Sequence, residues 1–156
     1  MFELPIHPKI VHIPIALAVL MPVVSVGLLV AWWREWLPAR TWAVAVALQA
    51  ILVTSAVVAM ETGENEEEQV EEVLASEQPL EEHEEAAEVF TYAAGATLGL
   101  MLLPLVIPGD GRKKVIATVA AAGTVAVFYL GYRVGEAGGD LVYEHGAADA
   151  WTQQSS

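Results

Sequence analysis

Four stretches of this chain contain no Asp, Glu, Lys or Arg, and this pattern limits the fold more than any other feature. They cover residues 10–33, 41–60, 89–109 and 115–132. Each stretch has roughly 18–24 residues, enough for a helix to cross a hydrocarbon core about 30 Å thick. Hydrophobic residues make up 55% of the chain and charged residues only 17%, which is unlike a soluble domain. The sequence therefore predicts an all-α protein with four transmembrane helices.

We expect one membrane domain over residues 1–156, with membrane helices at about 10–33, 41–60, 89–107 and 115–133. The links after the first and third helices are short, which favours a four-helix bundle built of two helical hairpins. Helix formers continue through residues 61–88, so we predict an acidic helical extension outside the membrane. Gly138 and Gly139 are expected to end the fourth helix, leaving residues 134–156 as an outer tail.

The net charge of −13 is concentrated in the extension, where eleven glutamates lie between Glu64 and Glu85. Such a charge run usually forms a solvated surface. Its sign disfavours nucleic acid and anionic lipid as partners of that surface. The chain has no cysteine, which excludes a disulfide, a thiolate metal site, a cysteine nucleophile and covalently attached c-type haem.

The basic residues predict how the chain is oriented in the bilayer. The two short turns contain five Lys and Arg residues, namely Arg34, Arg40, Arg112, Lys113 and Lys114, whereas the opposite face has only Lys9 and Arg133. Because basic residues favour the cytoplasmic side, the turns should lie in the cytoplasm. This places both termini, the acidic extension and all four histidines on the outer face of a multi-pass protein of the cytoplasmic (inner) membrane.

The two halves of the chain resemble each other weakly. His12 before the first helix matches His83 before the third, at an offset of 71 residues. Gly63-Glu64 after the second helix matches Gly135-Glu136 after the fourth, at an offset of 72. We therefore predict two similar, parallel hairpins, with chance similarity as the alternative.

The matched residues suggest two kinds of site on the outer face. His12 and His83 could be the two axial ligands of a haem b held between facing helices. With Glu64 and Glu136 they could instead form a mixed site for a transition-metal ion, and His7 and His145 could be further ligands. The competing hypothesis is a structural or interaction protein, whose histidines only cap helices and whose acidic extension docks a partner. Catalysis has little support, because no nucleophile–base arrangement or pair of buried acids is present.

Several motifs carry a resemblance to a known family. They are HPKIVHIPI at residues 7–15, TGE at 62–64, HE at 83–84 and GGDLVYEHG at 138–146. Together they resemble the DUF2231 family of small four-helix membrane proteins of bacteria and archaea. Some family members are fused to c-type cytochrome or Rieske domains, so the resemblance implies electron-transfer proteins as partners on the outer face. This chain has no cysteine to attach such groups. The bilayer is the partner that the sequence indicates most directly, and a homo-oligomer is compatible with it.

Overall fold

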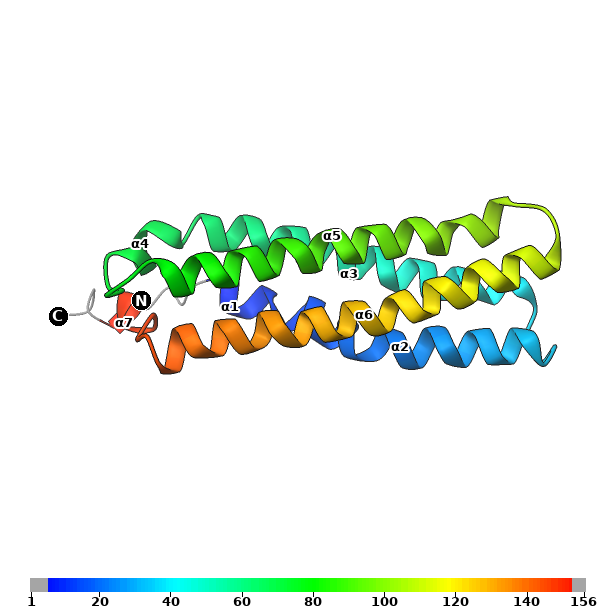
Figure 1. Ribbon diagram of the computed structural model, residues 1–156, viewed down its shortest axis with the longest axis horizontal. Helices are drawn as coiled ribbons and strands as arrows, with labels where there is room; N and C mark the ends of the chain where they lie inside the picture. Colours follow the sequence, from blue (N-terminus) through cyan, green and yellow to red (C-terminus); the bar gives the residue numbers. More distant parts are fainter. Residues whose placement is uncertain (1–5, 153–156) are drawn as a thin grey trace.

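The computed structural model describes residues 6–152, and in it four long helices form an elongated antiparallel bundle (Figure 1). These are α2 (His12–Trp33), α3 (Trp42–Glu64), α5 (Gln78–Val106) and α6 (Asp110–Tyr143). The shorter elements are α1 (His7–Ile10), the 3₁₀ turn η1 (Ala39–Thr41), α4 (Glu67–Glu71) and α7 (Asp149–Thr152). The elements α1, α4 and α7 lie at the same end of the bundle (Figure 1). We call it the outer end, after the orientation that the sequence predicts.

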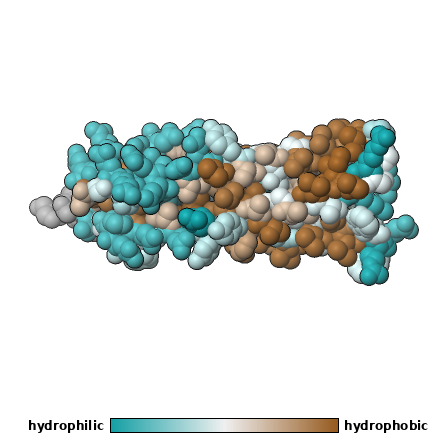
Figure 2. Space-filling model, in the orientation of Figure 1, coloured by the Kyte–Doolittle hydropathy of each residue, from teal (hydrophilic) through white to brown (hydrophobic). Residues whose placement is uncertain are grey.

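All four long helices are long and apolar enough to cross a membrane, which confirms the predicted all-α fold with four spans. The surface shows the same division (Figure 2). The outer end is hydrophilic, the other half of the bundle carries a hydrophobic belt, and the far tip is hydrophilic again. Large apolar side chains such as Val23, Val106 and Val115 are exposed, as expected of residues that face lipid. The protein is therefore an integral membrane protein.

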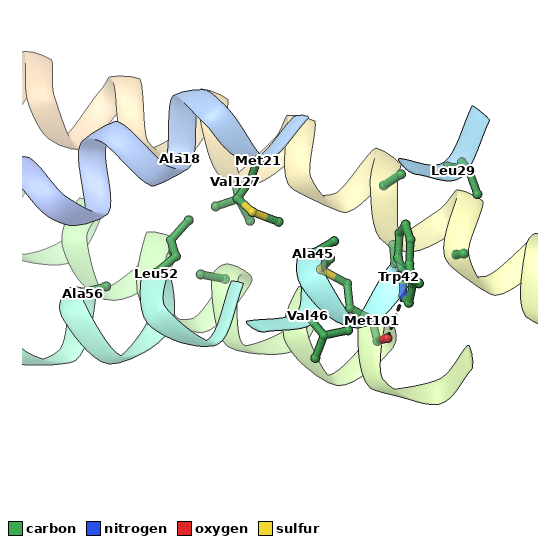
Figure 3. Packing of buried hydrophobic residues seen from close by; sticks show 14 of the residues in the cluster. Ala18, Met21, Leu29, Trp42, Ala45, Val46, Leu52, Ala56, Met101 and Val127 are labelled. Atoms are coloured by element: carbon green, nitrogen blue, oxygen red, sulfur yellow. Dashed lines mark hydrogen bonds between the residues drawn. The ribbon is translucent and has the colours of Figure 1, made fainter. Parts of the chain in front are cut away.

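The helices are held together by small side chains and a few buried hydrogen bonds. Ala45, Ala94 and Ala120 are fully buried, which lets neighbouring backbones approach closely. Toward the end opposite the outer end, Nε1 of the buried Trp42 donates a hydrogen bond of 3.0 Å to the Met101 carbonyl and so joins α3 to α5 (Figure 3). A second, small core of Leu80, Leu141 and Ala147 closes the outer end.

Buried positions repeat from one hairpin to the other at a spacing of 75 or 76 residues. Four of the six buried residues of α2 recur 76 residues later in α5, pairing Pro14, Ala18, Met21 and Ser25 with Phe90, Ala94, Thr97 and Met101. Buried residues of α3 recur 75 residues later in α6, pairing Trp42, Ala45, Val46, Gln49, Leu52 and Ala56 with Ala117, Ala120, Ala121, Thr124, Val127 and Gly131. The two hairpins thus present equivalent faces to one shared core.

This spacing corrects the predicted match between the halves. At an offset of 76 the partner of His83 is His7, and His12 corresponds to Glu88. At an offset of 75 the partner of Gly63 is Gly138 rather than Gly135. The expected register was wrong because it aligned identical residue types. The repeat lies instead in the pattern of buried positions along the helices.

The fourth helix also differs from its prediction. It continues through Gly138 and Gly139 to Tyr143, so residues 134–143 are helix rather than tail. The added turns pack on α5, where Leu141 contacts Leu80, and this burial outweighs the low helix propensity of glycine. The acidic extension is helical as predicted only in part. Its helical parts are the end of α3, the short helix α4 and the start of α5.

Candidate functional site

His7 lies at the start of α1 and packs its ring onto α3. Its Nδ1 atom is 2.8 Å from the Ala59 carbonyl, and because a carbonyl only accepts, Nδ1 carries the proton. The ring also covers Gly63, where an added Cβ would lie 3.2 Å from Cε1. The neutral imidazole then keeps the lone pair of its Nε2 atom, the nitrogen that can bind a metal or accept a hydrogen bond.

His83 lies in the first part of α5 and packs its ring onto α6 in the same way. An added Cβ at Gly138 would lie 3.0 Å from Cε1 of this ring. Val134, one helical turn before Gly138, has its carbonyl beside the ring and favours the protonated form. Nδ1 of His83 is nevertheless buried without a hydrogen-bond partner in the part of the chain that the structure describes.

The two histidines are equivalent in the repeat. His7 and His83 are 76 residues apart, while the glycines and the carbonyl residues beneath them, Gly63 with Gly138 and Ala59 with Val134, are 75 apart. Each hairpin thus presses one imidazole onto a glycine of its own second helix. We call His7 and His83 the histidine pair.

The electrostatics of this region favour a neutral ring at His83. His83 precedes the uncharged run of residues 89–109 by six residues, so it lies outside the apolar section of α5. Burial lowers the pKa of His83, and the positive charge of His7 lowers it further. The two rings are therefore within electrostatic reach of each other, and a neutral imidazole is the form that ligates metals.

One carboxyl group of the acidic extension, that of Glu84, has a pKa shifted in the opposite direction. The pKa of Glu84 is raised, first by partial burial and then by the negative charges of Glu67, Glu64, Glu71 and Glu81. The outer end of the bundle thus combines crowded carboxylates with the imidazole of His83, which resists protonation.

The other predicted ligands do not join the histidine pair. His12 is exposed on α2, and Glu64 is exposed at the end of α3. Glu136 and His145 line a separate cleft of about 430 Å³ with Glu82 and Asp140, and Glu136 also lies 3.6 Å from Arg133. Among the residues that the structure describes, no three His, Cys, Asp or Glu side chains are placed to hold a metal ion. The mixed site of histidines and glutamates is therefore not assembled.

Sequence reasoning missed the residues that fix the position of His7. Oε1 of Glu66 accepts hydrogen bonds from the backbone N–H of Ile6 at 2.8 Å and of His7 at 3.3 Å. This carboxylate therefore ties α1 to the end of α3, together with the Ala59 carbonyl. The sequence did contain a pattern that could have identified Gly138. Gly138 follows Gly63 by 75 residues, nearly the same spacing as the 76 residues between His7 and His83.

Comparison with known proteins agrees with the fold. Neither the curated proteins nor the solved structures gave a match. The family model described as "Predicted membrane protein (DUF2231)" matches residues 3–150, nearly the whole chain. This match includes both hairpins, the histidine pair and the glycines beneath it. The chain therefore belongs to the DUF2231 family of membrane proteins.

Proposed function

We propose that this protein is a membrane module that binds a redox-active metal group between its two hairpins, with His7 and His83 as the protein ligands. The observation that carries the proposal is the equivalence of the two imidazoles, each pressed onto a glycine and placed beside a carbonyl of the helix that follows. Histidine ligands commonly have one ring nitrogen held by a backbone carbonyl, which orients the other nitrogen toward a metal. In His7 the bond to Ala59 leaves Nε2 in that role.

The number of ligands favours haem b over a bare metal ion. A zinc or copper ion usually needs three or four protein ligands, and the described residues offer no such group. A haem iron needs only two axial ligands from the protein, because the porphyrin supplies the rest. When bound, the haem would supply one-electron transfer. The chain's own residues would hold and orient the two imidazoles, and the histidine pair here replaces the predicted His12–His83 pair.

The location follows from the distribution of charge. The turns on the far side of the bundle carry Arg34, Arg40 and the run 112–114, so we infer that the histidine pair faces the outside of the cytoplasmic membrane, with both termini outside. Electron-transfer proteins on that face are the partners we propose. The acidic extension would favour a basic docking surface on such a partner.

A structural role is the second candidate, and one observation favours it. His7 already makes a hydrogen bond that joins α1 to α3, and Glu66 strengthens the same connection. On this hypothesis the histidines only pack the outer end, and the acidic extension docks a protein partner. Substitution of either histidine would then lower stability without removing any bound group.

The decisive experiment is an absorption spectrum of the detergent-purified full chain, expressed with haem supplied and recorded before and after dithionite reduction. We expect a Soret band with sharp α and β bands on reduction. His7→Ala and His83→Ala should lose them, while His12→Ala and His145→Ala, which change exposed residues, should keep them. A colourless, folded protein would reject haem, and elemental analysis of the same sample would then separate a bound metal from a structural role.

A further inference from the structure

The middle of the bundle contains a small polar layer within the apolar core. Within the described chain, the fully or nearly fully buried polar side chains are Ser25, Gln49, Thr97 and Thr124, one from each long helix. Each lies near the middle of its uncharged run, so the layer lies near the centre of the bilayer. Polar groups at this depth need hydrogen-bond partners, because lipid offers none.

Two of these side chains satisfy each other. Oγ of Ser25 and Oγ1 of Thr124 are 3.0 Å apart. Oγ1 of Thr124 also lies 2.6 Å from the Ala121 carbonyl, and Oγ of Ser25 lies 3.3 Å from the Pro22 carbonyl. Because each hydroxyl has one proton, the pair donates two of these three bonds at a time. This pair therefore joins α2 to α6 with its hydroxyl groups already engaged.

Gln49 is satisfied only on one side. It is 0% exposed, and its Nε2 donates a hydrogen bond of 3.0 Å to the Ala94 carbonyl on α5. This bond fixes the orientation of the amide, because turning it over would place Oε1 against another acceptor. Oε1 is then the buried atom that has no hydrogen-bond donor among the described residues.

We propose that Gln49 binds a water molecule inside the bundle, near the centre of the membrane, through Oε1. The water donates one hydrogen bond to this atom. Thr97 lies one helical turn beyond Ala94 on α5 and offers a hydroxyl for a second bond, as an internal water usually needs two to four polar partners. Gly123 on α6 has no side chain beside this hydroxyl, and a Cβ there would lie 3.0 Å from Oγ1 of Thr97.

The test is water-edited solid-state NMR of the ¹⁵N-labelled full chain in lipid bilayers, in which magnetisation passes from water protons to nearby N–H groups. Gln49→Met identifies the side-chain signal of Gln49 by its disappearance. We expect this signal to receive magnetisation from water as the exposed Gln78 side chain does, whereas the buried backbone amide of Ala45 should receive none. If the Gln49 side-chain signal received as little magnetisation from water as the Ala45 amide, the proposal would be overturned.

A pair of variants checks the second contact. Thr97→Val keeps the shape of the side chain but removes the hydroxyl, and we expect loss of most of the transfer from water to Gln49. Thr118→Val makes the same change on the exposed face of α6 and should leave the transfer unchanged. Equal transfer in both variants would assign the water to Gln49 without Thr97 and so reject the two-contact site. Circular dichroism of each sample confirms that the bundle is intact.

Discussion

Gly138 provides the space that the imidazole of His83 occupies: a Cβ on this glycine would lie only 3.0 Å from Cε1 of the ring. The next helical glycine toward the N-terminus, Gly135, is different, because beyond the helix's own backbone no described atom lies within 4 Å of its added Cβ. Two glycines three residues apart on α6 thus serve different purposes. Of these two glycines, only Gly138 is required by the packing of α5 on α6.

This difference gives a matched pair of variants. Gly138→Ala should force the His83 ring to move, at a cost of about 1–3 kcal/mol that offsets the gain in helix propensity. Gly135→Ala should only gain helix propensity and be neutral or stabilising by up to about 1 kcal/mol. Thermal unfolding in detergent, followed by circular dichroism, compares them. Equal stability of the two variants would show that the ring does not depend on Gly138.

Glu66 should hold α1 against α3. Its carboxylate accepts the N–H groups of Ile6 and His7, so Glu66→Ala removes a cap worth about 1 kcal/mol. We expect faster hydrogen exchange at the amides of residues 6 and 7, measured by NMR or by mass spectrometry of the N-terminal peptide. Glu68→Ala is the control, because it removes an exposed carboxylate of the same extension. If Glu68→Ala accelerated these amides equally, general charge rather than the cap would be responsible.

Acid should weaken the outer end through His83. Burial and the charge of His7 lower its pKa in the folded state, so the unfolded chain takes up a proton that the folded chain resists. The free energy of unfolding should therefore fall as pH drops below about 6.5, the ordinary value for histidine, and flatten below the lowered folded-state pKa. In cofactor-free protein, His83→Gln should reduce this slope. A slope unchanged by His83→Gln would assign the acid sensitivity to other groups.

Glu84 should act in the opposite direction. Its raised pKa means that the folded state binds a proton more readily than the unfolded chain, so the cost of ionising it appears as pH rises through and above about 4.5. Glu84→Gln should therefore stabilise the protein at pH 7 in chemical or thermal unfolding. His83 and Glu84 change the free energy of unfolding in opposite directions as pH falls. Glu84→Gln should therefore leave in place the loss of stability that His83 causes below about pH 6.5.

The membrane-spanning architecture was predictable because it depends on composition. An uncharged run long enough to cross the bilayer has few alternatives to a helix, so the four spans followed from the positions of charged residues alone. Helix ends were harder. Gly138 and Gly139 resemble a helix stop in sequence, yet the packing of Leu141 on Leu80 carries α6 past them.

The candidate site was predictable only in part. His83 and the presence of a matching histidine could be proposed from the sequence, but His12 was chosen instead of His7. Matching residue types along the sequence could not reveal that His7 contacts the Ala59 carbonyl or that Glu66 holds the backbone of α1 against α3. Buried positions on the helices carry the repeat, and burial is a property of the packed bundle rather than of any local motif.

Trp42 should contribute to the association of α3 with α5. Trp42→Phe keeps most of the buried aromatic surface but removes the hydrogen bond to the Met101 carbonyl. Hydrogen bonds between membrane helices contribute about 0.6 kcal/mol on average and up to about 1.7. We expect a loss of stability in this range in detergent unfolding. Trp36→Phe, at an exposed position near the same end of the bundle, should cost less.

The proposed orientation can be tested with single cysteines, because the chain has none of its own. Gln78→Cys places a thiol at the exposed start of α5. Gly111→Cys places one in the exposed first turn of α6, where an added Cβ meets no described atom within 4 Å beyond the helix's own backbone. Because five basic residues lie at the turns, we expect the turns in the cytoplasm and residue 78 outside. A membrane-impermeant maleimide should therefore label Gln78→Cys in intact spheroplasts. Gly111→Cys should be labelled only after permeabilisation. The reverse pattern would place the histidine pair in the cytoplasm and exclude partners on the outer face.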